Sequence, residues 1–129
     1  MRFAHVMIRV NNLDESIEFY STVLGMKLQD VVVNDEYQYT IAFLGYGDDR
    51  HKETCLELTY NWGKSSYEIG TAFGHLAIAV VDVYKACEEV SAKGGSVTRP
   101  AGPLKGKPDS IIAFIKDPNG YQIELVTQK

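Results

Sequence analysis

The order of apolar and polar residues in the first half of the chain predicts one strand, one helix and three further strands. Residues 2–10 alternate as in a strand. Asn11-Asn12 offers a cap for a helix that Gly25 ends. The apolar residues that share one face of this helix are Leu13, Ile17, Tyr20, Val23 and Leu24. Strand-like stretches follow at 27–33, 37–44 and 54–60, with a polar loop at 48–53.

The second half repeats this order from Phe73 onward. Residues 73–81 predict a strand, and Asp82 caps a helix that Gly94-Gly95 ends. The face of this helix that packs inward is expected to hold Val83, Ala86, Cys87 and Val90. The pattern continues with a short strand at 96–98 and a loop rich in Pro, Gly and Lys at 99–109. It ends with a strand at 110–115, a turn at 117–120 and a strand at 121–127.

This repeat predicts an α+β protein built from two βαβββ modules. The modules span about 1–61 and 73–127, with a packed linker at 62–72. A chain of 129 residues forms one compact domain, or two half-domains that share a core. We expect a single domain over residues 1–129.

Composition narrows the possible partners and the compartment. The net charge of −4 provides no basic surface for nucleic acid or an anionic membrane. No apolar run approaches the roughly 20 residues that span a bilayer, and the start of the chain leads directly into a strand-like pattern, so no signal peptide is expected. Cys55 and Cys87 lie within apolar patterns, which is typical of buried reduced thiols. We therefore expect a cytoplasmic protein.

Two histidines and two glutamates occupy equivalent places in the repeat. His5 and His75 follow Phe-Ala and Phe-Gly, and Glu57 and Glu124 each precede a leucine near the end of their half. The His-to-Glu spacing is 52 residues in the first half and 49 in the second. Side chains alternate across a strand, so residue parity places all four on the face opposite the apolar one.

A single His or Glu on a strand is usually structural or solvent-facing. Four of them at repeat-equivalent positions on one face favour a divalent-metal site. His51 differs, because it lies in a charged run and is expected at the surface.

With these residues identified, the chain resembles bacterial glyoxalase I, the lactoylglutathione lyases of the vicinal-oxygen-chelate superfamily. The resemblance covers essentially the whole chain. The tracts that carry it are LDESIEFYSTVLGMKL at 13–28, AFLGYG at 42–47, LELTYNWG at 56–63, GTAFGH at 70–75 and IAFIKDPNGYQIEL at 112–125.

The resemblance implies a homodimer whose modules pair between chains. Each site would then use His5 and Glu57 of one subunit with His75 and Glu124 of the other. The implied reaction isomerises the hemithioacetal of methylglyoxal and glutathione to S-lactoylglutathione through an enediolate, with a divalent metal as Lewis acid. Glu124 is the expected base, with Glu57 as its possible partner on the other face. The short chain resembles the nickel- or cobalt-activated bacterial group more than the zinc-dependent eukaryotic one.

The resemblance also implies contacts to glutathione. Arg9 and Asn61 match positions that bind the charged ends of the peptide. Lys105 and Lys107 fall in a loop with a further anion contact, and which of them aligns is open; solvated loop charges are an equal alternative. Thr71 stands where some relatives have a basic residue.

Other functions on the same fold remain alternatives. An extradiol dioxygenase binds iron through two His and one carboxylate, whereas Glu57 here supplies a fourth ligand. A methylmalonyl-CoA epimerase would have Gln in place of Glu57 and no YNWG tract. A small-molecule binding or resistance protein typically loses the metal ligands. No glycine-rich dinucleotide motif is present, so no nicotinamide or flavin is expected.

Overall fold

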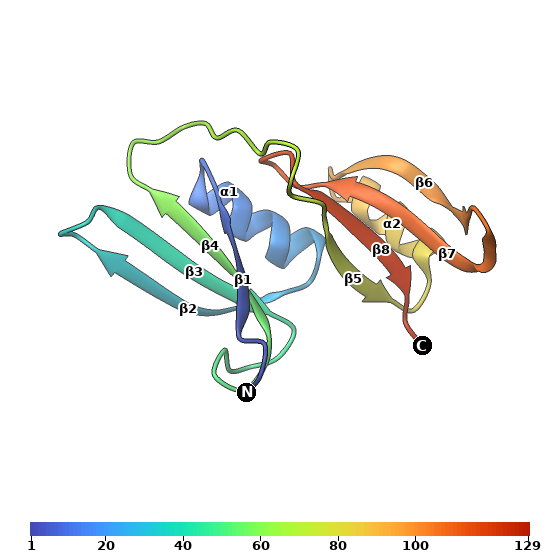
Figure 1. Ribbon diagram of the computed structural model, residues 1–129, viewed down its shortest axis with the longest axis horizontal. Helices are drawn as coiled ribbons and strands as arrows, with labels where there is room; N and C mark the ends of the chain where they lie inside the picture. The colour runs from blue at the N-terminus through green and yellow to red at the C-terminus, as the bar shows by residue number, and fades with distance from the viewer. The chain divides into compact units, whose positions relative to one another are not determined.

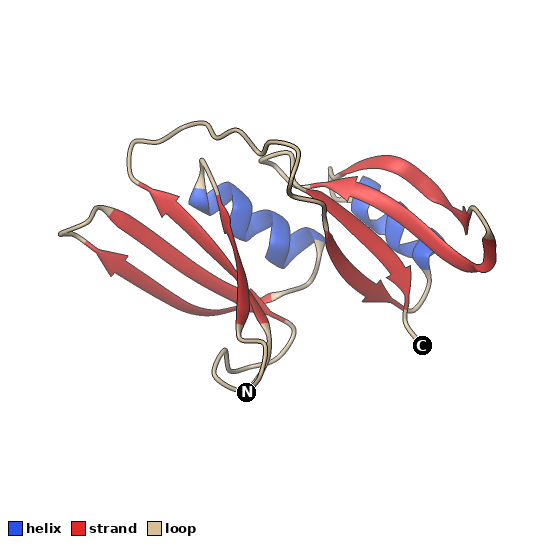
Figure 2. Cartoon of the chain, in the orientation of Figure 1, coloured by secondary structure: helices blue, strands red, loops and turns tan.

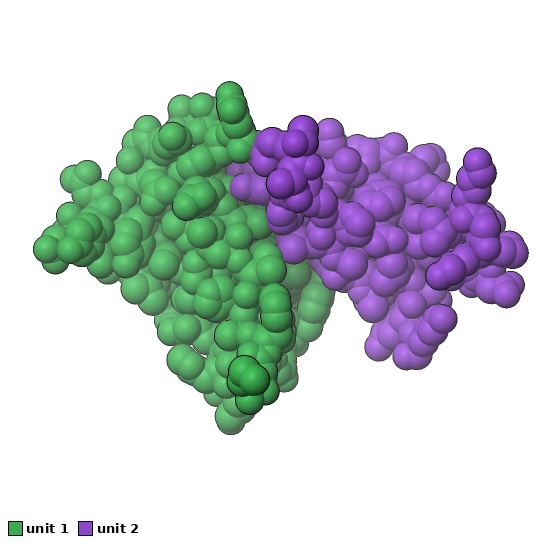
Figure 3. Space-filling model, in the orientation of Figure 1, with its two compact units in different colours: residues 1–68 green, residues 69–129 purple.

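The chain folds as two compact units, residues 1–68 and 69–129 (Figure 3). The structure is a computed structural model that describes all residues from 1 to 129. Each unit contains a strand, a helix and three further strands in that order (Figures 1 and 2). The predicted α+β class with a βαβββ repeat is confirmed.

Unit 1 is a four-stranded sheet with its helix on one face. Its elements are β1 (His5–Arg9), α1 (Leu13–Glu18), the π-helical turn η1 (Phe19–Val23), β2 (Lys27–Asn34), β3 (Tyr39–Gly45) and β4 (Cys55–Asn61). The strand order is β1-β4-β3-β2, and β1 runs parallel to β4 while the other pairs are antiparallel. The Asn12 side chain caps α1 by accepting the N–H of Glu15 at 3.0 Å, as its position in the sequence predicts.

The first helix departs from the prediction in its second half. The α-helical hydrogen bonding ends at Glu18, and residues 19–23 continue with the wider π-helical turn. A π-turn adds a residue to one turn and shifts which side chains face inward. Phe19 is consequently buried beside Tyr20, although it lies outside the face predicted from α-helical spacing.

Unit 2 has the same topology. Its elements are β5 (Leu76–Val80), α2 (Val83–Ala92), β6 (Ser96–Leu104), β7 (Lys107–Lys116) and β8 (Gln122–Thr127). The strand order is β5-β8-β7-β6, with β5 parallel to β8. Asp82 caps α2 as predicted, and Gly94 follows the helix with a φ of +84° that suits glycine.

The predicted loop at 99–109 is wrong. These residues form most of a β-hairpin, in which β6 and β7 pair around a turn at Lys105 and Gly106. Pro100 and Pro103 are tolerated because β6 is an edge strand with several irregularities in its register. The Arg99 guanidinium secures these irregularities by donating to the carbonyls of Gly102 (3.1 Å), Ile112 (2.8 Å) and Pro103 (3.0 Å). Side-chain hydrogen bonds thus replace part of the regular ladder.

The two faces of each sheet divide as residue parity predicts. The apolar residues of the central strands are buried against the helices, among them Ile8, Leu58, Ile78, Ile123 and Leu125. Helix α1 packs on β3 and β4, and α2 packs on β6, β7 and β8. The opposite face of each sheet is left to the candidate ligands, and we call it the ligand face. None of the helices has the length and apolar character needed to span a bilayer.

Candidate metal-binding pairs

His5 and Glu57 come together on the ligand face of unit 1. Nε2 of His5 lies 3.4 Å from Oε1 of Glu57. His5 starts β1 and Glu57 lies on the adjacent β4, where it stands opposite Met7 in the parallel register. The carboxylate is largely buried at 13% exposure, whereas the imidazole is 41% exposed. An accessible nitrogen therefore stands beside a sheltered carboxylate.

Unit 2 repeats the pair. Nε2 of His75 lies 3.0 Å from Oε2 of Glu124. His75 immediately precedes β5, which begins at Leu76, three residues after the start predicted at residue 73. The exposures match those in unit 1, at 42% for the imidazole and 19% for the carboxylate. The repeat seen in the sequence is thus also a repeat of side-chain geometry.

An aromatic ring supports each histidine. The rings of His5 and Phe43 meet edge to face with centroids 5.9 Å apart, and those of His75 and Phe114 do so at 5.2 Å. Phe43 stands opposite Glu57 in the β3–β4 register, and Phe114 stands opposite Glu124 in the β7–β8 register. Each phenylalanine therefore limits the orientation of the imidazole beside it.

The two glutamates differ in what holds their second oxygen. Thr59 donates its hydroxyl to Oε2 of Glu57 at 3.1 Å, so both oxygens of this carboxylate have neighbours. The equivalent residue after Glu124 is Val126, which has no hydroxyl to donate. Glu124 therefore keeps one carboxylate oxygen without a protein donor.

The donor set of each pair fits a divalent cation. Imidazole nitrogen and carboxylate oxygen are common ligands of first-row metals. Two ligands at about 2.1 Å from an ion and at right angles to each other are about 3 Å apart. The observed separations of 3.4 and 3.0 Å are close to this value. Within the chain, no three His, Cys, Asp or Glu side chains gather as a metal-binding group, so each unit contributes two donors.

The predicted substrate contacts lie in two different places. Arg9 and Asn61 end the parallel strands β1 and β4, four residues beyond His5 and Glu57. The Asn61 amide donates to the Tyr67 hydroxyl at 3.1 Å, which holds its side chain in place. In unit 2, Lys105 and Lys107 flank Gly106 at the β6–β7 turn, and both are exposed. His51 is exposed in its loop, as predicted.

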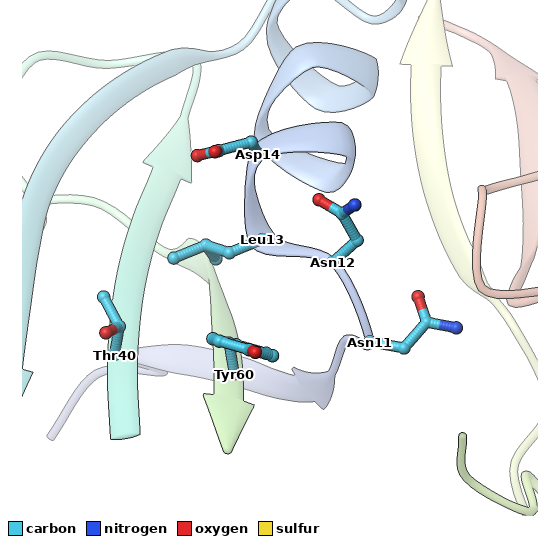
Figure 4. Close-up of a pocket in the computed structure, with 6 residues that line it drawn as sticks. All are labelled: Asn11, Asn12, Leu13, Asp14, Thr40 and Tyr60. Carbon is cyan, nitrogen blue, oxygen red and sulfur yellow. The ribbon is translucent and has the colours of Figure 1, made fainter. Parts of the chain in front are cut away.

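A separate pocket in unit 1 is unrelated to these pairs. Asn11, Asn12, Leu13, Asp14, Thr40 and Tyr60 line it (Figure 4). Thr40 and Tyr60 are register partners of the parity that faces α1. The pocket is therefore on the helix side of the sheet, and it contains none of the predicted site residues.

The cysteines have the character expected of structural thiols. Neither forms a disulfide; Cys55 is buried and Cys87 is partly so. Burial raises the pKa of the Cys55 thiol, and the nearby Arg50 charge opposes this only in part. Burial also raises the pKa of the Cys87 thiol. Neither group is a ready nucleophile at neutral pH.

Comparison with known proteins identifies the family. The model of the Glyoxalase/Bleomycin resistance protein/Dioxygenase superfamily matches residues 2–125. The chain belongs to this superfamily. It is 55% identical to a probable lactoylglutathione lyase of Vibrio parahaemolyticus, over 99% of this chain and 91% of that one. It is 54% identical to a lactoylglutathione lyase of Haemophilus influenzae, over 100% and 94% of the two chains.

A solved structure agrees with these relatives. Glyoxalase I from Zea mays superposes with a TM-score of 0.94 at 46% identity, over 98% of this chain. This chain spans 44% of the length of the maize protein. The predicted membership of the glyoxalase family is confirmed.

Sequence reasoning missed the residues that support the pairs in this glyoxalase fold. A repeat of Ile-Ala-Phe, at 41–43 and 112–114, marks both phenylalanines in the sequence. The role of Thr59 was also detectable, because it lies two residues after Glu57 and so shares its face.

Proposed function

We propose that this chain is a lactoylglutathione lyase, which isomerises the hemithioacetal of methylglyoxal and glutathione to S-lactoylglutathione and so detoxifies methylglyoxal. It acts as a cytoplasmic homodimer. One domain of residues 1–129 supplies module 1 (about 1–61) and module 2 (about 73–127), joined by the linker at 62–72. The names and identities of the relatives support the activity.

The observation that carries this proposal is the pair of matched His–Glu contacts. Each unit offers one imidazole and one carboxylate on its ligand face. Two such pairs provide the four ligands His5, Glu57, His75 and Glu124, drawn from different subunits. In this arrangement neither unit by itself supplies all four ligands.

The proposed cofactor is one divalent ion per site, nickel in preference to cobalt or zinc. When bound, such an ion acts as a Lewis acid that stabilises negative charge on adjacent substrate oxygens, a contribution of several kcal/mol. Phe43 and Phe114 keep the two imidazoles oriented, and Thr59 keeps the Glu57 carboxylate in place. These contacts reduce the entropy lost on ligand binding.

Glu124 is the proposed base. The reaction removes a proton from the carbon that bears sulfur and returns one to the neighbouring carbon. The Glu124 carboxylate accepts the proton and then donates it, and its unengaged oxygen is suited to this task. Glu57 is its catalytic partner on the other face, with less freedom because Thr59 restrains it. Proton transfer by a positioned group is worth typically about 10²–10⁴-fold in rate.

Arg9 and Asn61 are the proposed contacts to the charged ends of glutathione. Both end adjacent strands on the ligand face, about 13 Å along the strand from the metal-binding residues at about 3.3 Å per residue. A tripeptide linked through its central thiol spans such a distance. Lys105 and Lys107 are proposed anion contacts from the partner subunit's module.

Complementation between two inactive variants tests this arrangement. His5→Ala and His75→Ala are expected to be inactive alone, because each loses a ligand from both sites. In a mixed dimer, one site loses both histidines and the other regains its full set. Random mixing gives half heterodimers with one intact site each, so about a quarter of wild-type activity should return.

The assay follows thioester absorbance after the nickel-loaded protein is mixed with methylglyoxal and glutathione. The two variants are unfolded and refolded together, with each refolded alone as a control. Absence of recovery, while refolded wild type is active, contradicts shared sites. Absence of thioester formation by the wild type contradicts the proposed activity itself.

A further inference from the structure

The loop between β3 and β4 distinguishes unit 1 from unit 2. It spans residues 46–54, whereas the corresponding connection between β7 and β8 is the tight turn at 117–121. The extra length is not needed to join two antiparallel neighbours, since the shorter turn does this in unit 2. The longer loop carries Arg50, to which the proposed mechanism gives no role.

This loop is held in a defined conformation. The Asp49 carbonyl accepts the N–H groups of Lys52 (3.0 Å) and Glu53 (3.2 Å). The Arg2 guanidinium donates to the carbonyls of Arg50 (3.1 Å) and Glu53 (3.3 Å). The Glu53 carboxylate occupies the space that a side chain at Gly47 would need. The base of the Arg50 side chain is therefore fixed by contacts at several points.

The Arg50 guanidinium lies on the ligand face. Its central carbon is 4.1 Å from the centroid of the Phe43 ring, and its Nε donates to Oδ2 of Asp30 at 2.8 Å. Phe43 is 5% exposed. The equivalent Phe114 has no cation over its ring and is less buried. Arg50, paired with Asp30, is thus a guanidinium that only one of two otherwise similar half-sites has.

A β-bulge places the acidic partner of Arg50. Leu28 pairs with Leu44 and Asp30 pairs with Phe43, so Gln29 is the additional residue in β2. Without this bulge, Gln29 would stand opposite Phe43. The bulge brings the Asp30 carboxylate to the ligand face, where it orients the guanidinium and leaves the two terminal amino groups, Nη1 and Nη2, without a protein acceptor.

The position of Arg50 indicates which part of a substrate it reaches. Phe43 stands directly opposite Glu57, so the guanidinium lies in the same row of the sheet as the proposed metal ligand. Arg9 and Asn61 lie four residues further along their strands. Arg50 is therefore beside the reacting carbons and away from the contacts proposed for the charged ends of the thiol peptide.

We propose that Arg50 is a specificity-determining residue that binds a carboxylate on the side chain of the 2-oxoaldehyde portion of the substrate. The inference rests on the proposed function and adds a substrate class to it: hemithioacetals of 2-oxoaldehydes with an acidic side chain. A guanidinium with two free amino groups in a fixed plane matches the two oxygens of a carboxylate. Stacking on Phe43 and the bond to Asp30 orient it before the substrate arrives.

The test compares two substrates with the same thiol. Glutathione hemithioacetals are prepared from methylglyoxal and from 4,5-dioxopentanoate, a 2-oxoaldehyde that ends in a carboxylate. The measured quantity is the ratio of kcat/KM for the acidic substrate to that for methylglyoxal. Arg50→Gln should lower this ratio roughly tenfold to a hundredfold, as expected for loss of a hydrogen bond between charged groups. Arg50→Lys, which retains charge without the planar fork, should lower it less.

Lys52→Gln is the matched control. It removes the same charge from the same loop, but Lys52 is exposed and contacts only Asp49. The ratio of the two kcat/KM values in Lys52→Gln should equal that of the wild type. Added salt should reduce the wild-type ratio and should have no such effect on Arg50→Gln, because screening acts on the charge contact alone.

Two results would overturn the inference. In the first, Arg50→Gln lowers kcat/KM equally for both substrates, so the ratio stays at the wild-type value. Arg50 would then be a structural residue or a contact to the thiol. In the second, Arg50→Gln changes kcat/KM for neither substrate, so the ratio again stays at the wild-type value. Failure of the proposed function looks different, since the wild type would then convert neither substrate.

Discussion

Replacing Thr59 with valine removes one hydrogen bond from a proposed metal ligand and changes little else. The Thr59 hydroxyl donates to Oε2 of Glu57 at 3.1 Å. Valine has nearly the same shape, so the β4 backbone and the neighbouring strands should be unaffected. The change isolates the role of the hydrogen bond that distinguishes Glu57 from Glu124.

The size of the effect follows from the surroundings of Glu57. A hydrogen bond to a charged group contributes about 1.5–3 kcal/mol. The Glu57 side chain is 13% exposed, so water replaces the lost donor only in part. Loss of a partner that orients a metal ligand typically costs about 10–100-fold in affinity. We therefore expect Thr59→Val to raise the Kd for nickel by roughly tenfold to a hundredfold, equivalent to about 1.4–2.7 kcal/mol.

Isothermal titration of the metal-free protein with nickel measures this change. At saturating nickel, kcat should fall much less than affinity, because Glu124 is the proposed base. Val126→Thr is the matched control in unit 2. It offers Glu124 the donor that Glu57 has, and it should lower kcat while leaving the Kd for nickel unchanged or smaller. Circular dichroism checks that both variants are folded.

The opposite pattern would refute this reasoning. If Thr59→Val lowered kcat at saturating nickel and left the metal affinity intact, then Glu57 would be the principal base. If Val126→Thr had no effect on kcat, then the unengaged oxygen of Glu124 would not be what suits it for proton transfer.

Three further predictions concern the base, the metal and alkaline pH. Glu124→Gln should bind nickel more weakly and lose nearly all turnover even at saturating metal; retention of most of kcat would exclude it as the base. Removal of metal with a chelator should abolish turnover, and nickel should restore more activity than zinc, as measured by thioester absorbance; equal or higher zinc activity contradicts the metal assignment. Tyr46 donates its hydroxyl to the Leu24 carbonyl at 2.8 Å; the residue as a whole is 53% exposed, but desolvation of the hydroxyl raises its pKa to about 12. The ordinary value is about 10, so its contribution to stability is complete below that pH and is lost as the pH rises toward about 12. The difference in urea midpoint between wild type and Tyr46→Phe should therefore narrow over this range, and a constant difference would contradict the shift.

Local patterns were sufficient for most of the fold and for both His–Glu pairs. Alternation and helical spacing depend on near neighbours in the sequence. The same order of elements in both halves supported the prediction made for each half. Local patterns gave the wrong prediction at residues 99–109, where proline and glycine indicate a loop by local preference. There the strand depends on Arg99 reaching carbonyls of two different segments, and such a contact is not visible in local sequence.

The role of Arg50 was beyond sequence reasoning for another reason. Its position over Phe43 depends on a bulge at Gln29, and one additional residue reverses the parity of all that follows in the strand. No pattern in residues 27–34 reveals where a bulge falls. The bulge at Gln29 is visible only in the register between β2 and β3.

The irregular edge of unit 2 also bears on how the protein behaves at high concentration. Regular edge strands present rows of unpaired amides that other chains can extend into fibrils. In β6, two prolines remove amide donors, and the guanidinium of Arg99 donates to the carbonyls of Gly102 and Pro103. This edge strand is therefore a poor template for intermolecular sheet growth, which lowers the tendency of the chain to aggregate.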